Sequence, residues 1–272
     1  MVKAILTLGG LGLLFGIFLG VAYRKFAVEK DPKAEEVLAV LPGANCGACG
    51  FPGCSGLAEA IAKGEAPANA CKAGGASLAE IVAQVMGVEA SAEDAKVARL
   101  MCRGGEEKAV RRAKYVGLTD CRSAKTVGSG GKACTFGCLG LGNCVRACPF
   151  GAMSMGADGL PVINPEICTG CGVCVETCPQ GVLSLVPAQN RVFVACSSTA
   201  PGREVRKTCQ VGCIACRICE RTCEHDAIHV ENNLAKIDYS KCTNCGRCAE
   251  KCPQKIIINE TAATDDKQAT AI

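Results

Sequence analysis

Three runs of four cysteines with one shared spacing constrain this chain more than any other feature of its sequence. The clearest run has the pattern C-x2-C-x2-C-x3-C and is formed by Cys168, Cys171, Cys174 and Cys178. The same spacing recurs from Cys213 to Cys223 and from Cys242 to Cys252. Bacterial ferredoxins use this spacing to bind [4Fe-4S] clusters, with the fourth cysteine serving the neighbouring cluster. Zinc sites use pairs of C-x2-C instead, so the runs predict iron-sulfur modules.

An internal repeat organises these runs into two halves. Residues 134–153 align with residues 209–228, and residues 168–183 align with residues 242–257. The first run departs from the pattern, because Leu141 stands where the second half has Cys216. Cys134 is the nearest replacement, and we predict that it completes the first ligand set.

Crossed ligation between paired runs predicts four clusters. The first half supplies the sets Cys134, Cys138, Cys144 and Cys178, and Cys148, Cys168, Cys171 and Cys174. The second half supplies the sets Cys213, Cys216, Cys219 and Cys252, and Cys223, Cys242, Cys245 and Cys248.

A fifth set lies nearer the N-terminus and has a different spacing. The segment NCGACGFPGC with the following helix gives C-x2-C-x4-C-x16-C through Cys46, Cys49, Cys54 and Cys71. Its glycines allow the backbone to approach a metal centre closely. Four thiolates also suit zinc, so a zinc site remains the alternative to a cluster here.

Four cysteines lie outside these five sets, namely Cys102, Cys121, Cys196 and Cys209. They could be free thiols that pack as small hydrophobic side chains. The alternative is a sixth cluster between the two halves, since the chain has 24 cysteines in all. The cofactor prediction is therefore five [4Fe-4S] clusters, with a sixth left open.

The composition agrees with modules held together by metal–thiolate bonds. Aromatic residues make up only 4% of the 272 residues and tryptophan is absent, so a large core of rings is excluded. Small domains that lack such a core commonly depend on metal binding for stability. The net charge of +4 is modest, and no basic stripe interleaved with aromatic residues predicts nucleic-acid binding.

The N-terminus predicts a membrane anchor. Residues 4–23 carry no charged side chain, and such a helix is about 30 Å long, the thickness of the hydrocarbon core of a bilayer. Arg24 and Lys25 follow at once, so the positive-inside rule places the rest of the chain in the cytoplasm. A signal peptide is the competing interpretation, but no A-x-A-like cleavage site follows. The reducing cytoplasm favours metal-bound thiols over disulfides.

These observations predict an α+β chain in which one transmembrane helix precedes a small Gly-rich [4Fe-4S] domain and two tandem ferredoxin-like 2[4Fe-4S] modules. Helices are expected at 28–40, 56–64, 77–87 and 93–101, where apolar residues recur at helical spacing. The predicted ranges are an anchor at 1–27, the Gly-rich domain at 28–92, a helical and basic connector at 93–131, modules at 132–190 and 191–259, and a disordered tail at 260–272.

Basic residues cluster in the connector and include Arg103, Lys108, Arg111 and Arg112. Such charges commonly form a solvated face, but they also steer an acidic protein partner toward its docking site. Neither a G-x-G-x-x-G turn after a strand nor a Walker motif occurs, so we expect neither a flavin nor a nucleotide in this chain.

The order of these motifs resembles a known family. The apolar helix, LPGANCGACGFPGC, CLGLGNCVRACPFGAM and GCIACRICERTC are similar to the B subunits of Rnf complexes, membrane-bound ferredoxin:NAD⁺ oxidoreductases that couple electron flow to ion translocation. The resemblance covers nearly the whole chain. It implies an electron-accepting subunit at the cytoplasmic membrane that takes electrons from reduced ferredoxin and passes them to membrane subunits and a flavin- and NAD-binding subunit.

Two other functions remain open at this point. Similar C-x2-C-x4-C-x16-C domains resemble those of corrinoid iron-sulfur proteins, which suggests a membrane-tethered reductase for a regulatory or corrinoid protein. A metal-storage or zinc-structural protein is the third alternative, and it would lack the brown colour of iron-sulfur clusters.

Overall fold

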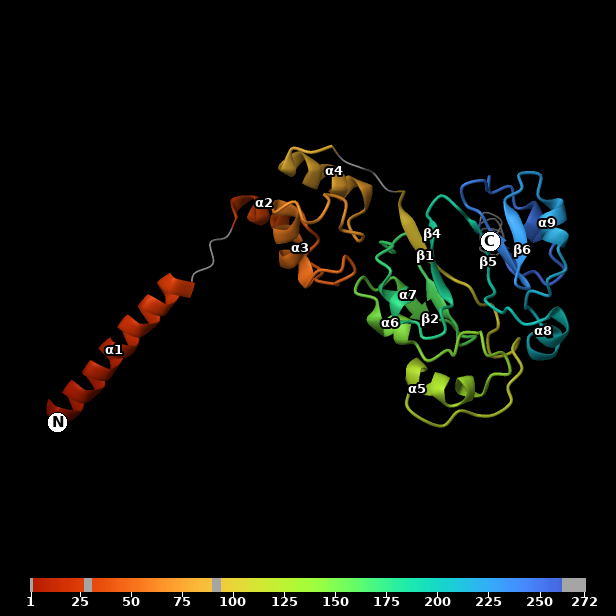
Figure 1. Cartoon of the computed structure of the whole chain (residues 1–272). Helices are drawn as coiled ribbons and strands as arrows, with labels where there is room; N and C mark the ends of the chain where they lie inside the picture. The colour runs from red at the N-terminus through yellow and green to blue at the C-terminus, as the bar shows by residue number, and fades with distance from the viewer. Residues whose placement is uncertain (1, 27–30, 90–93, 261–272) are drawn as a thin grey trace, which may run out of the picture.

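The computed structural model describes residues 2–26, 31–89 and 94–260. The predicted boundaries at 27/28 and 92/93, and the predicted disorder of residues 261–272, lie outside these ranges. Helix α1 (Val2–Phe26) contains the predicted anchor and stands apart from the rest of the chain (Figure 1). Its segment Leu6–Phe26 is long and apolar enough to cross a membrane, and none of it is buried against the protein. The predicted N-terminal helix is confirmed.

Three helices build the Gly-rich domain: α2 (Pro32–Val40), α3 (Gly53–Ala62) and α4 (Gly75–Met86). The Asp31 side chain caps α2 by accepting a hydrogen bond from the amide of Lys33. Val37, Leu57 and Val82 come from the three helices and are almost fully buried in one core. The helices predicted from the spacing of these apolar residues are confirmed, and their core supports the loops that carry Cys46 to Cys71.

Each ferredoxin-like module has two short antiparallel sheets. The first module pairs β1 (Lys96–Leu100) with β4 (Leu183–Pro187), and β2 (Met153–Met155) with β3 (Pro161–Ile163). The second module pairs β5 (Val192–Val194) with β8 (Ile257–Asn259), and β6 (Ile228–Glu231) with β7 (Leu234–Ile237). In both modules the first strand pairs with the last, so the internal repeat extends to the strand order.

The helix predicted at 93–101 is wrong, because this segment forms β1. Arg99 breaks the apolar pattern and is nevertheless buried, with its guanidinium 2.7 Å from Glu260 and 5.5 Å from the centre of the Phe193 ring. Strand β4 pairs with β1, and residues of the second module contact Arg99. The apolar spacing therefore reflects burial by two neighbours and not one face of a helix. The range predicted as a connector therefore contributes a strand, and Glu260, predicted to be disordered, pairs with Arg99.

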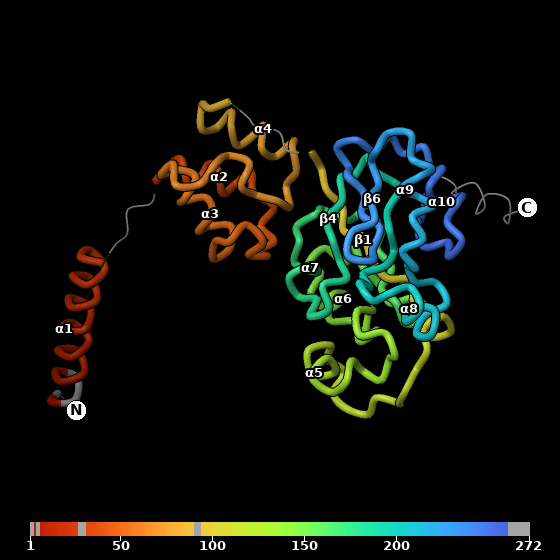
Figure 2. The backbone as a smooth tube through the Cα atoms, turned by 45° about the vertical axis from the view of Figure 1, so that its right-hand side comes forward, coloured from red at the N-terminus to blue at the C-terminus, as the bar shows by residue number. Residues whose placement is uncertain are grey.

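An insert separates the first strand of each module from its first cysteine run. The first insert follows β1 and carries α5 (Cys121–Thr126) and the 3-10 turn η1 (Gly128–Gly131), whereas the second follows β5 and carries α8 (Gly202–Thr208) (Figure 2). The inserts contact each other through a β-bridge between Ala109 and Cys209. The four cysteines outside the five predicted sets all lie in these inserts.

The third cysteine of each run lies in a very short helix. These helices are α6 (Asn143–Ala147), α7 (Val173–Thr177), α9 (Ile218–Thr222) and α10 (Arg247–Glu250). The residue before each is left-handed, with φ of 73° at Gly142, 85° at Gly172, 58° at Arg217 and 75° at Gly246. This conformation turns the chain so that the second and third cysteines of a run face one cavity. At this position, directly before the helix, only the α9 run has a residue with a Cβ, Arg217.

We predict opposite effects of substitution at two equivalent cap positions. Arg217→Gly should stabilise the second module by about 0.5–1 kcal/mol because glycine adopts a positive φ without strain, whereas Gly172→Ala should destabilise the first module by about 1 kcal/mol. No atom lies closer than 3.7 Å to a methyl group built on Gly172, so backbone strain alone is tested. The measurement is the temperature at which the visible absorption bleaches under anaerobic heating. Equal shifts of the same sign would contradict this account.

Candidate metal centres

Two predicted ligand sets each line one cavity. The set Cys148, Cys168, Cys171 and Cys174 surrounds about 340 Å³ of space, and the set Cys213, Cys216, Cys219 and Cys252 surrounds about 350 Å³. Each cavity also contains the proline that follows the distant cysteine, Pro149 in the first and Pro253 in the second. Four thiols around one apolar cavity are the donor set that a [4Fe-4S] cluster requires.

Hydrogen bonds and pKa shifts show how closely these thiols are held. The amide of Ala98, in β1, donates to Sγ of Cys168 over 3.4 Å. Burial, together with the neighbouring thiols Cys168 and Cys171, raises the pKa of Cys174 to about 12. Burial likewise raises the pKa of Cys219 to about 12, with Cys213 and Cys216 adding to the shift. Thiols that lie close together and have raised pKa values stay protonated without metal, and they release their protons when metal binds them.

The last predicted set also comes together. Burial raises the pKa of Cys248 to about 11, with contributions from three nearby thiols, namely Cys242, Cys245 and Cys223. The amide of Ala227 donates to Sγ of Cys223 over 3.4 Å. This repeats the amide-to-sulfur contact at Cys168. Such contacts orient thiolate ligands and set cluster potentials.

The N-terminal set lies at the end of the Gly-rich domain that faces the first module. Burial raises the pKa of Cys71, and the thiols of Cys54 and Cys49 add to the shift. Asn45 supports this loop, because its side-chain oxygen accepts a hydrogen bond of 2.8 Å from the amide of Cys54. Cys46 is close enough to the first module to raise the pKa of Cys171, after the larger effect of burial.

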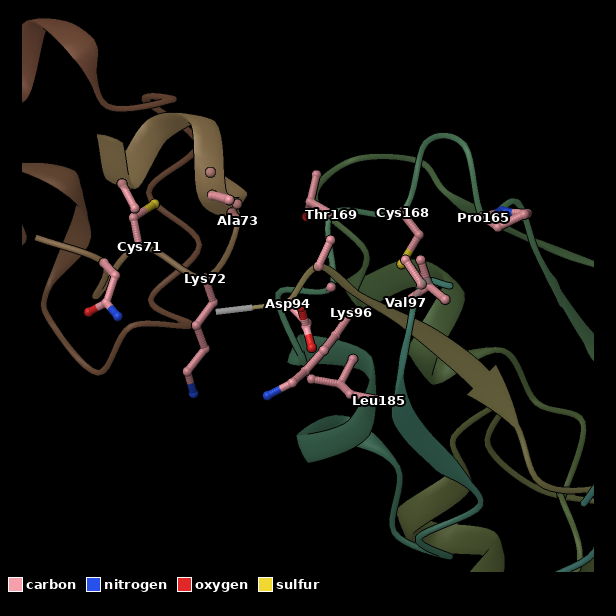
Figure 3. Close-up of a pocket in the computed structure, with 18 residues that line it drawn as sticks. Cys71, Lys72, Ala73, Asp94, Lys96, Val97, Pro165, Cys168, Thr169 and Leu185 are labelled. Atoms are coloured by element: carbon pink, nitrogen blue, oxygen red, sulfur yellow. The ribbon is translucent and has the colours of Figure 1, made fainter. Parts of the chain in front are cut away.

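An open cavity lies between this domain and the first module. The loop of Cys71, Lys72 and Ala73 lines one side, whereas Cys168 and Thr169 lie opposite, with Lys96 between them (Figure 3). The N-terminal set and the set of Cys168 are therefore neighbours in the structure.

The structure groups the cysteines of the first run differently from the prediction. Cys138, Cys144 and Cys178 line a cavity of about 380 Å³, but its fourth thiol belongs to Cys121 and not to Cys134. Burial, together with the thiols of Cys178 and Cys121, raises the pKa of Cys144 to about 11. Cys121 thus lies in the cavity of the run that has Leu141 in place of a cysteine.

The first insert is anchored where it delivers this thiol. The backbone amide of Cys121 donates to the side-chain oxygen of Asn143 over 3.0 Å. The side-chain nitrogen of Asn143 donates to the carboxylate of Asp120 over 2.6 Å. Asp120 in turn caps α5, and hydrogen bonds from Ser123 and Asn143 lower its pKa to about 2. Because Asn143 precedes Cys144, this contact places Cys121 beside Cys144. The empty ligand position at Leu141 was the sequence signal for a missing thiol, but it did not identify which cysteine fills it.

Cys134 lies in another cavity, of about 420 Å³, with the three remaining cysteines of the inserts: Cys102, Cys196 and Cys209. The predicted alternative set of Cys102, Cys121, Cys196 and Cys209 therefore differs from the structure in one member, Cys121, which is exchanged for Cys134. Buried Lys132 also lines this cavity.

No three histidine, cysteine or acidic side chains in the described residues are grouped so that they could hold a single metal ion. A zinc ion would require such a group, with its sulfur atoms about 2.3 Å from the metal. Four cavities are lined by four thiols each, the donors that an iron-sulfur cluster requires.

The basic residues predicted to bind a partner have contacts within the chain. Arg103 donates to the carbonyl oxygen of Lys255, Arg112 donates to that of Ala133, and Arg111 forms a 2.7 Å ion pair with Glu106. Arg111 and Arg112 are exposed, whereas Arg103 and Lys108 are half-buried.

Comparison with known proteins identifies iron-sulfur domains in this chain. An Fe-S cluster family model matches residues 41–73, and a 4Fe-4S dicluster domain model matches residues 133–182 and 212–256. Over 264 residues the chain is 49% identical to the B subunit of the Na⁺-translocating ferredoxin:NAD⁺ oxidoreductase complex of Acetobacterium woodii, covering 96% of this chain and 79% of that protein.

Two further relatives agree. The B subunit of the proton-translocating ferredoxin:NAD⁺ oxidoreductase complex of Clostridium ljungdahlii is 45% identical over 98% of this chain and 95% of its own length. The B subunit of the ion-translocating oxidoreductase complex of Methanosarcina acetivorans is 44% identical over 94% of this chain and 97% of its own length.

We predict that Asn45→Ala weakens metal binding at the N-terminal set alone. The variant leaves the Cys54 amide without its acceptor and puts alanine at a φ of 47°, which together should destabilise the loop by about 1–3 kcal/mol. Anaerobic iron loss to a chelator should become faster for about four iron atoms per chain, the content of one cluster.

Asn45→Asp is the matched control, because it keeps the acceptor and a residue type that tolerates a positive φ. It should lose iron at nearly the rate of the unaltered protein. If Asn45→Ala loses iron no faster than Asn45→Asp, the hydrogen bond does not hold this loop.

Proposed function

This chain belongs to the B-subunit family of Rnf-type ion-translocating oxidoreductase complexes, and from this membership we propose that it carries electrons from reduced ferredoxin to the membrane subunits of such a complex. It is then the iron-sulfur electron-transfer subunit of an oxidoreductase that passes electrons on without transforming a substrate. The electrons continue to a flavin- and NAD-binding subunit, where ion translocation is coupled to their flow.

The observation that carries this proposal is the arrangement of the thiol sets side by side. The thiol of Cys144, in the neighbouring set, is close enough to contribute to the raised pKa of Cys174. The thiol of Cys46, in the Gly-rich domain, contributes in the same way to the raised pKa of Cys171. Bound to these thiols, [4Fe-4S] clusters supply one-electron carriers whose potentials depend on hydrogen bonds to sulfur and on burial. Both dependences are present here, as amide-to-sulfur hydrogen bonds and half-buried or buried cysteines.

The position of the N-terminal set supports a direction for electron flow through this series. The set of Cys46 belongs to the domain that directly follows α1, and its other side faces the set of Cys168 across the cavity of Figure 3. We propose that electrons enter through the ferredoxin-like modules and leave from the N-terminal set toward the membrane subunits.

The membrane orientation follows from charge. Arg24 and Lys25 lie in the last turn of α1, and the positive-inside rule places such residues on the cytoplasmic side. We propose that α1 crosses the cytoplasmic membrane once and that residues 31–260 lie in the cytoplasm. A reductase for a regulatory or corrinoid protein gains no support from the relatives, which are all named as subunits of translocating complexes.

The direct test uses the full chain in detergent, purified without oxygen. Reduced ferredoxin is mixed rapidly with the oxidised protein, and cluster reduction is followed by EPR of frozen samples. We expect ferredoxin to be oxidised while signals of reduced [4Fe-4S] clusters appear in this chain. Ferredoxin that stays reduced in the presence of fully loaded protein would overturn the proposed donor.

We also predict that the exposed basic residues of the first insert steer ferredoxin. Changing Arg111 and Arg112 to glutamate should lower the second-order rate of electron uptake about tenfold at low salt, because steering between opposite charges accelerates encounter. Lys63→Glu, an exposed charge change in the Gly-rich domain, is the matched control and should leave the rate almost unchanged. A rate that is independent of ionic strength in the unaltered protein would contradict steering by charge.

A further inference from the structure

We infer that Cys102, Cys134, Cys196 and Cys209 bind a sixth [4Fe-4S] cluster between the two ferredoxin-like modules, and that Cys121 replaces Cys134 as a ligand in the first module. The inference rests on the proposed function, since it assumes that the other thiol sets bind clusters. Neither matching family model covers this site as a whole, because Cys102 precedes both matches to the dicluster domain and Cys196 and Cys209 fall between them, so that only Cys134 lies inside a match.

The internal repeat relates the four thiols in two pairs. Cys102 lies two residues after the end of β1, and Cys196 lies two residues after the end of β5. Cys134 and Cys209 form the second pair, each four residues before the first cysteine of the standard run. Each module therefore contributes the same two positions to one site, as expected for a site on the boundary between two repeats.

The hydrogen bonds of this site follow the same symmetry. The amide of Cys138 donates to Sγ of Cys102 over 3.4 Å, and the amide of Cys213 donates to Sγ of Cys196 over 3.4 Å. The same kind of contact, at the same distance, is made by Cys168 and Cys223 in the motif-defined sets. Cys102 and Cys196 are thus held in the same way as ligand positions that the motifs define.

Two glycines show that the sulfur atoms converge. A methyl group built on Gly104 would lie 3.2 Å from Sγ of Cys209 and 3.9 Å from Sγ of Cys102. A methyl group built on Gly137 would lie 3.6 Å from Sγ of both Cys102 and Cys134. The cavity volume of about 420 Å³ is close to the 340 to 380 Å³ of the three other thiol-lined cavities.

The cross-module contacts bring the two halves of the site together. The backbone of Gln210 donates to the carbonyl oxygen of Lys108 over 2.9 Å, next to the bridge between Ala109 and Cys209. On the other side, the Ser197 hydroxyl donates to the carbonyl oxygen of Met101 over 2.8 Å. The first bond lies next to Cys209 in the sequence, and the second lies next to both Cys102 and Cys196.

Lys132 supplies an independent argument for negative charge here. Only 4% of this side chain is exposed, and its ammonium group donates to the carbonyl oxygens of Gly104 over 3.0 Å and Cys138 over 2.6 Å. Within residues 2–26, 31–89 and 94–260, no carboxylate forms an ion pair with it. A buried ammonium group without a counter-charge is costly. Thiolates formed when iron replaces the thiol protons in this cavity and in the adjoining cavity of Cys138 provide that charge.

Free thiols explain these observations less well. Free buried cysteines need no shared cavity, no equivalent hydrogen bonds in both modules and no buried cation beside them. The regrouping also fills the ligand position at Leu141 with Cys121 and leaves none of the 24 cysteines unassigned. A cluster at this site would connect the second module to the first, because Cys138 and Cys213 are ligand positions of the adjacent sets.

Double substitutions distinguish the proposed grouping from the alternatives. Iron and acid-labile sulfide are measured per chain after reconstitution of the full-length protein, with EPR as a second readout. We expect about 24 iron atoms for the unaltered chain and about 20 for Cys209→Ala, since each cluster holds four. The variant lacking both Cys134 and Cys209 should also keep about 20, because both thiols serve one cluster, whereas the variant lacking both Cys121 and Cys209 should fall to about 16.

The opposite results would overturn the grouping. If the pair Cys121 and Cys209 costs one cluster while the pair Cys134 and Cys209 costs two, Cys121 belongs to the boundary site. Unaltered protein that saturates at about 20 iron atoms, with electron uptake from ferredoxin intact, overturns the sixth cluster but leaves the proposed function standing. Protein that binds no iron overturns both. The count on unaltered protein does not depend on whether any variant folds.

Discussion

Bringing four sulfur atoms to one cavity is the constraint on which the rest of this structure depends. The strands of the two modules are short, their sheets have two strands each, and the helices α6, α7, α9 and α10 are only four or five residues long. Such elements bury little apolar surface, so their packing alone stabilises them weakly. Buried cysteines form a large part of both module cores, beside residues such as Ala98, Leu183, Val192 and Ile228. Metal–thiolate bonds therefore take the place of the larger side chains that stabilise an ordinary core.

Spacing within a run was sufficient to predict the local part of this design. Cys168 to Cys174 and Cys213 to Cys219 each lie within seven residues, and a left-handed turn between them leaves few ways to arrange three thiols. The repeat also predicted correctly that two similar modules follow one another. The helices of the Gly-rich domain were predictable for a different reason, since Val37, Leu57, Ile61 and Val82 recur at helical spacing and share one core.

Contacts between residues far apart in the sequence could not be predicted from the spacing of the cysteines or of the apolar residues. The place of Cys121 depends on one side chain, Asn143, which lies 22 residues further along the chain and holds the first insert against α6. Strand β1 was mistaken for a helix because its burial comes from two separate neighbours, β4 and the second module, neither of which is local in sequence. In both cases tertiary contacts decided what the local pattern left undetermined.

The boundary cavity also has a consequence for how the protein is made. A run such as Cys242 to Cys248 presents three thiols as soon as a short segment leaves the ribosome, whereas the cavity of Cys102, Cys134, Cys196 and Cys209 draws on four segments spread over both modules. Closing such long loops is slow compared with local contacts. This cavity can therefore form only after both modules have folded and their inserts have paired at Ala109 and Cys209. Its completion would mark the end of maturation, and a chain arrested earlier would expose unprotected thiols to oxidation.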